Sequence, residues 1–144
     1  MADITITAGN VVPSAAAAGV TKIFRATAGA AINAGQLIYL DTADSNKAKL
    51  ADANSATALA RAPIGIAVNS AGTGQEVSYV KEDDDLTIGA TVANGTVYVL
   101  SATPGGIAPA ADLTTGWFPC VVAVGKSSTK VAFSAAGLRS TTAL

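Results

Sequence analysis

A chain of 144 residues is long enough to form one domain that buries roughly two-thirds of its unfolded surface without disulfides or metals. The net charge is −1, the nine basic residues are scattered singly, and there is no histidine. This composition excludes catalysis and zinc binding that depend on imidazole. It also does not predict nucleic-acid binding, which needs clustered lysine and arginine.

No membrane span or signal peptide is predicted. The residues after Met1 lack a charged stretch followed by an apolar one, and no apolar run reaches the roughly 18 residues of a spanning helix. We therefore expect a soluble protein made in a reducing cytoplasm. Half of the residues are hydrophobic, but alanine is the commonest and only three Phe, three Tyr and one Trp are present, so we expect a core of small side chains.

The first residues alternate in polarity. Ile4 and Ile6 fall on one face and Thr5 on the other, which predicts a short strand before Gly9. We predict an N-terminal arm and linker over residues 1–20 and a single β domain over residues 21–144. The alternation does not say what the strand pairs with, so an ordinary first strand of the domain is the open alternative.

Further along, alternating and β-branched segments predict strands over residues 23–26 and 36–40, with a polar turn over 41–46 and a returning strand over 47–51. Residues 54–62 are rich enough in alanine for one short helix, which Pro63 ends. Strands are then expected over residues 64–68 and 75–80.

The second half repeats this plan. Asn94 and Gly95 predict a tight hairpin turn between strands over residues 90–93 and 96–100, because a type I′ turn needs positive φ at both central positions. A long loop is expected over residues 103–109. The last two strands are expected over residues 117–124 and 130–134.

Two stretches of the chain read as versions of one another. Tyr39 aligns with Tyr98 in matching decapeptides, Pro63 aligns with Pro119, and Tyr79 aligns with Phe133 in the same order. We therefore predict an internal repeat over about residues 28–80 and 87–134. The fold class is all-β: a small barrel or sandwich of short strands built from two related halves, with an extended N-terminal arm and at most one short helix. Chance similarity between short alanine- and valine-rich strands is the alternative.

Candidate sites are few. The single cysteine, Cys120, lies in an apolar strand and reads as a buried hydrophobe rather than a nucleophile. Trp117 and Phe118 form the densest aromatic pair, with core packing and an interface anchor as the two interpretations. No catalytic residue, metal site or cofactor is predicted.

One run of acidic residues stands out. It comprises Glu82, Asp83, Asp84 and Asp85 and lacks the spacing of a calcium-binding loop. We expect a solvated turn, with an acidic contact for a basic partner or an ion site as the alternatives.

The order of several segments carries a resemblance. Residues 1–12, 28–41 and 98–109, together with residues 51–52 and 63–67, resemble the small decoration, or cement, proteins of tailed-phage heads. The likeness covers nearly the whole chain, and the acidic run is the part without a match.

The resemblance implies a non-enzymatic, β-rich virion subunit on the outer surface of the capsid, commonly a homotrimer that binds the major capsid protein. It implies that an N-terminal arm reaches the capsid, and the matching residues here are Ile4, Thr5, Ile6, Val11 and Val12. An exposed strand in that arm could extend a sheet edge on the shell. The alternative is a receptor- or glycan-binding head-fibre module, motivated by Trp117 and the acidic run; an enzyme that uses carboxylates and lysine alone has no positive support.

Overall fold

The computed structural model describes residues 3–14, 22–135 and 139–144. Within these ranges eleven strands form two antiparallel sheets, and the only helices are four short 3₁₀ turns. The all-β prediction is confirmed. No helix in the described part of the chain is long and apolar enough to cross a membrane.

The strands and 3₁₀ turns have the following bounds. The strands are β1 (Val11–Val12), β2 (Ile23–Thr27), β3 (Leu37–Asp41), β4 (Lys47–Leu50), β5 (Gly65–Ala67), β6 (Glu76–Val80), β7 (Glu82–Ile88), β8 (Val97–Leu100), β9 (Ile107–Pro109), β10 (Val121–Gly125) and β11 (Lys130–Ser134). The 3₁₀ turns are η1 (Ala8–Asn10), η2 (Thr42–Asp44), η3 (Ala58–Arg61) and η4 (Ala110–Asp112).

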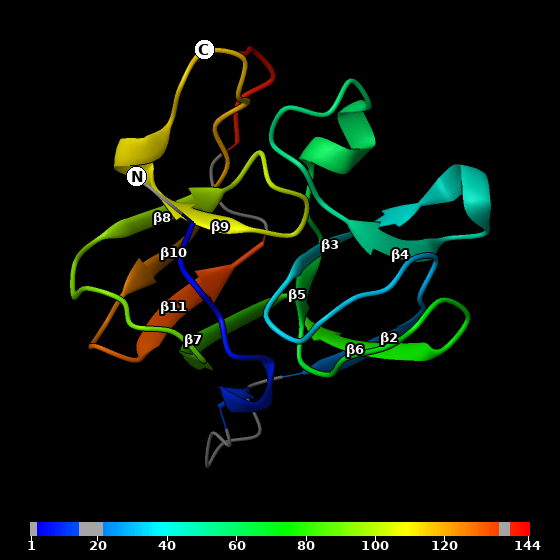
Figure 1. Ribbon diagram of the computed structural model, residues 1–144, viewed down its shortest axis with the longest axis horizontal. Coiled ribbons are helices and arrows are strands. Elements are labelled where there is room, and N and C mark those ends of the chain that lie inside the picture. Colours follow the sequence, from blue (N-terminus) through cyan, green and yellow to red (C-terminus); the bar gives the residue numbers. More distant parts are fainter. Residues whose placement is uncertain (1–2, 15–21, 136–138) are drawn as a thin grey trace.

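The two sheets share one topology. The five-stranded sheet has the order β2-β6-β5-β3-β4, and the six-stranded sheet has the order β1-β7-β11-β10-β8-β9. With β1 set aside, each strand of the first sheet has a counterpart in the same position of the second. Figure 1 shows the two sheets side by side, the earlier half of the chain on the right and the later half on the left. Two related halves are therefore present.

The aligned residues of the repeat occupy equivalent strands. Tyr39 lies in β3 and Tyr98 in β8, while Tyr79 lies in β6 and Phe133 in β11. A single residue, Lys81, separates β6 from β7, so the chain passes directly from one sheet into the other. The halves thus begin at β2 and β7, a few residues before the repeat that the sequence predicts.

The first half closes on itself. Ala28, after β2, forms a parallel bridge with Ala48 in β4, and the N–H of Gly29 donates to the carbonyl of Ala48 at 2.8 Å. Both alanines are fully buried, and their small side chains allow this close approach. A cluster that includes Ile38, Val77 and these alanines fills the interior of this half.

A larger core cluster spans both halves. It is made of Leu37 and Ile66 from the first half and of Leu86, Leu100 and Phe133, among others, from the second. All five side chains are at most 2% exposed. The halves are therefore parts of one domain with a continuous apolar interior.

Several predicted elements differ in detail. The helix expected over residues 54–62 is only the turn η3, and the loop expected over residues 103–109 contains β9. No strand forms over residues 90–93. Gly95 has φ +80° while Asn94 does not have positive φ, and the N–H of Gly95 donates to Gly125 at 2.8 Å, so this turn is tied to β10 and is not a type I′ hairpin.

Candidate functional site

The N-terminal segment, residues 3–14, lies against its own domain between β7 and β9 (Figure 1). The N–H of Ile4 donates to the carbonyl of Ile107 at 2.9 Å, and the N–H of Thr7 donates to that of Gly89 at 2.8 Å. The prediction of a strand over Ile4–Ile6 is wrong. One of these backbone hydrogen bonds goes to β9 and the other to the residue after β7, so no continuous ladder forms before η1. Only β1 pairs in register, Val11 with Ile88 and the next residue with Thr87.

The predicted arm residues divide into two groups. Ile4 and Ile6 are half-buried and pack against the larger core, and Val11 is 7% exposed. Thr5 is exposed, and Val12 is 52% exposed at the edge of the six-stranded sheet. Three of the five side chains therefore stabilise the chain's own fold, and two are open to a partner.

Buried polar groups hold both ends of the N-terminal segment. The hydroxyl of Ser101, 1% exposed, donates to Asp3 Oδ1 at 2.7 Å. At the other end the N–H of Ser14 donates to Asp83 Oδ2 at 2.6 Å, and Asp83 is 4% exposed. Hydrogen bonds to a carboxylate are stronger than those between neutral groups, so these contacts fix where the segment begins and ends.

Three glycines make room for the segment, and we call the space they line the glycine groove: Gly35, Gly89 and Gly106. A Cβ atom on Gly106 would lie 2.5 Å from Asp3 Oδ2, and one on Gly89 would lie 2.7 Å from the carbonyl oxygen of Thr7. A Cβ on Gly35 would overlap the side chain of Ile6. Sequence reasoning missed this groove, because turn glycines look alike until the segment they accommodate is known.

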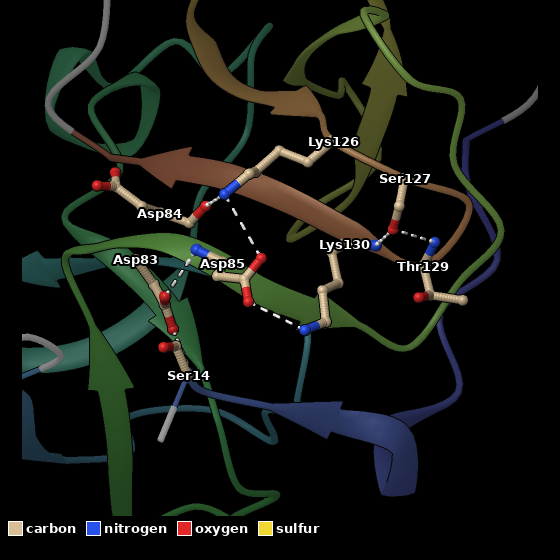
Figure 2. A network of polar contacts seen from close by, with 8 residues as sticks. All are labelled: Ser14, Asp83, Asp84, Asp85, Lys126, Ser127, Thr129 and Lys130. Carbon is tan, nitrogen blue, oxygen red and sulfur yellow. Dashed lines mark hydrogen bonds and ion pairs between the residues drawn. The ribbon is translucent and has the colours of Figure 1, made fainter. Parts of the chain in front are cut away.

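The acidic run is not a solvated turn. All four residues belong to β7, which pairs with β11. Figure 2 shows their environment: Asp83 points to Ser14, while Asp85 lies between two lysines of the β10–β11 region. Lys130 Nζ lies 2.9 Å from Asp85 Oδ2, and Lys126 Nζ lies 3.5 Å from Asp85 Oδ1.

The two lysines partly offset the negative charge of this run. Lys126 Nζ also donates to the backbone carbonyl of Asp84 at 2.7 Å. In this run the side chains of Glu82 and Asp84 are exposed, that of Asp85 is 45% exposed beside its two lysines, and only Asp83 is buried. The prediction of a turn was wrong because it considered the run alone. The lysines that neutralise it follow more than 40 residues later in the chain.

Replacing Lys130 by methionine is expected to raise the pKa of Asp85. The hydrogen bond from Lys130 is the main cause that holds this pKa below its usual value of 3.8. A depressed carboxylate pKa contributes stability above pH 3.8 that is lost as the pH falls through the folded value, so the variant loses that part of its acid sensitivity. Carboxyl NMR titration measures the change, with Lys22→Met as the control; unchanged Asp85 titration in Lys130→Met would contradict the assignment.

Trp117 and Phe118 are both involved in packing within the chain. Trp117 is half-buried against the larger core. The guanidinium of Arg61 lies 3.7 Å from the centre of the Phe118 ring, and the N–H of Phe118 donates to Ala53 at 2.8 Å. These aromatic residues therefore join the two halves.

The remaining chemistry is sparse in the described residues. Cys120 is 1% exposed, and burial raises the pKa of its thiol, which suits an inert core residue. No group of three or more Asp, Glu, Cys or His side chains there could hold a metal ion.

The surface beside β1 is a candidate contact site. An open groove of about 580 Å³ lies there, lined by residues of the N-terminal segment and of the neighbouring segments, five of them threonines: Thr5, Thr7, Gly9, Asn10, Val12, Thr87, Gly89, Ala90, Thr91 and Thr129. A second exposed apolar feature is the pair Val97 and Val124, which face each other on β8 and β10. Comparisons with protein-family models, with curated proteins and with solved structures find no match to this chain.

Proposed function

We propose that this protein is a non-enzymatic structural subunit of a phage head. It binds the outer surface of the capsid as a homotrimer, contacts the major capsid protein and stabilises the expanded shell. The observation that carries the proposal is the edge strand β1, where Val12 is exposed beside a polar groove of about 580 Å³. The order of the segments that resemble decoration proteins supports the same function.

The proposed contact with the shell involves fewer residues than the whole N-terminal arm. Since Ile4, Ile6 and Val11 are used inside the subunit, the shell would meet Thr5, Val12 and the groove beside them. A loop of the capsid protein that fills this groove covers the apolar side chain and pairs with the surrounding threonine hydroxyls.

Stabilisation then follows from binding alone. A subunit that binds only the expanded shell shifts the equilibrium toward that state by mass action. Three weak contacts on one trimer act together, which raises the overall affinity by about a hundredfold or more when the geometry allows simultaneous binding.

Cosedimentation with empty expanded heads of the phage that encodes the chain tests the proposal. We expect wild-type protein to bind and to raise the temperature at which the shell breaks. Val12→Asp should weaken binding at least about tenfold because it places a charge in the contact. Val124→Asp, on a different part of the sheet, is the matched control and should bind as wild type. Absence of binding by the wild-type protein, or full binding by Val12→Asp, would overturn the proposal.

One observation favours the receptor- or glycan-binding alternative. A depression of about 650 Å³ brings Trp117 together with Asp3, Ser101 and Asp112 and with threonine side chains. An aromatic face beside carboxylates and hydroxyls suits a sugar ring. A glycan screen with wild-type protein and Trp117→Ala distinguishes the two functions, since a structural subunit gives no signal in either case.

A further inference from the structure

The second half of the domain is incomplete without the N-terminal segment. In the first half β2 and β4 meet directly, through the bridge between Ala28 and Ala48. Ala26 pairs with Val77 in the first half, and Leu86 pairs with Val131 in the second. Since Val77 and Val131 occupy equivalent positions in β6 and β11, Leu86 corresponds to Ala26. Two residues further along, Ile88 therefore corresponds to Ala28.

No such bridge joins β7 to β9 in the described part of the second half. Ile88 pairs instead with Val11, and Ile107 in β9 accepts the hydrogen bond from Ile4. The N-terminal segment thus lies between β7 and β9 and takes the place of the direct contact that their counterparts, β2 and β4, make in the first half.

The segment contacts described residues of the domain along its length. These contacts run from the Asp3–Ser101 hydrogen bond at one end to the Ser14–Asp83 bond at the other, with Ile6 packed beside Gly35 between them. Neither hydrogen bond, nor the packing of Ile6 beside Gly35, involves the residues that connect the segment to β2. An identical segment from a second copy would make the same contacts with the same geometry.

The residues between the segment and β2 set how far the segment can reach. Seven residues separate Ser14 from Lys22, and eight peptide units span up to about 28 Å when extended. Exchange of an identical element between protomers is a low-cost route to association, because each domain binds its neighbour's segment through the same interactions that it makes with its own.

We propose that the glycine groove is an acceptor site for residues 3–14 of a second copy of this chain. The chain's own segment competes at an effective concentration in the millimolar range, which keeps exchange between copies rare in dilute protein. Copies held side by side at a comparable local concentration exchange their segments and become linked. This inference does not depend on the proposed capsid binding.

Two full-length variants separate the donor from the acceptor. Ile4→Asp combined with Ile6→Asp spoils the segment but leaves the groove intact. Gly106→Ala weakens the groove: its Cβ would lie 2.5 Å from Asp3 Oδ2, so the carboxylate must turn away from its hydrogen bond with Ser101, and no positive φ complicates the substitution. When the two variants are mixed, the intact segment of the Gly106→Ala variant can bind well only in the intact glycine groove of the Ile4→Asp, Ile6→Asp variant.

We expect a one-to-one heterodimer when the two variants are mixed at about 20–50 µM, since the competing segment in each chain is disabled. Native mass spectrometry with a mass tag on one variant detects the heterodimer, and each variant alone should keep the oligomeric state of the wild-type protein. In the control mixture, Gly9→Ala takes the place of Gly106→Ala. Nothing lies within 4 Å of a Cβ atom added at Gly9, so the segment of this variant stays in its own groove. The control mixture should therefore give no heterodimer. Absence of heterodimer from two variants that keep their β-sheet circular dichroism would overturn the proposal.

A second measurement on otherwise wild-type protein covers the case in which a variant does not fold. A photo-crosslinking amino acid at the exposed position Thr5 is introduced into ¹⁴N- and ¹⁵N-labelled protein, and the two are mixed and irradiated at about 1 mM. Crosslinked peptide pairs that combine both isotopes support exchange between copies. Pairs of a single isotope only, at this concentration, would overturn it.

Discussion

Phe133→Ala is expected to lower the free energy of unfolding by about 3–5 kcal/mol. Phe133 is 2% exposed and belongs to the larger core cluster, where β11 lies between β7 and β10. It pairs with Asp83 on one neighbouring strand and with Ala123 on the other, both of them also buried. Removing the ring leaves a cavity that these short side chains cannot fill. Chemical denaturation should show a lower midpoint with an unchanged slope.

The matched control lies on the same sheet. Val124→Ala removes an apolar side chain that is 38% exposed, and we expect a loss below about 1 kcal/mol. Because domains of this size have only about 5–15 kcal/mol of total stability, the Phe133 variant should lose a large fraction of it and the control little. Equal losses in the two variants would mean that Phe133 does not fill the core as described.

Much of the fold could be predicted because strand patterns are local. The alternation of β6 and β11, and the match of Tyr39 with Tyr98, are properties of a few neighbouring residues and hold in the structure. Boundaries were less reliable. Gly95 illustrates why: its turn is set by a hydrogen bond to Gly125, thirty positions away, which no local pattern reveals.

The candidate site was harder to predict for the same physical reason. A period of two shows that Ile4 and Ile6 share a face, but not that this face meets the chain's own core. Likewise the acidic run reads as solvated until Lys126 and Lys130 are placed beside Asp85. Pairing over long sequence distances decides both cases, and capsid binding itself stays a prediction.

Asp83 is buried and its neighbour Asp84 is exposed, so alanine variants of these two residues test the role of the acidic run. Asp83→Ala is expected to destabilise the protein by about 1–3 kcal/mol, because two backbone N–H groups lose a buried charged acceptor. These donors are Ser14, at 2.6 Å from Oδ2, and Asp85, at 3.0 Å from Oδ1. Asp84→Ala changes an exposed side chain of the same charge and should stay within about 0.5 kcal/mol of wild type.

Hydrogen exchange adds a local measurement to this pair. Since Asp83 holds the end of the N-terminal segment, its alanine variant should exchange the amides of Ile4, Thr7 and Ser14 faster, while amides in β3 keep their protection relative to global unfolding. Asp84→Ala should leave both regions unchanged. If the two variants lost the same stability and showed the same exchange, the run would act through its net charge and not through the anchor at Ser14.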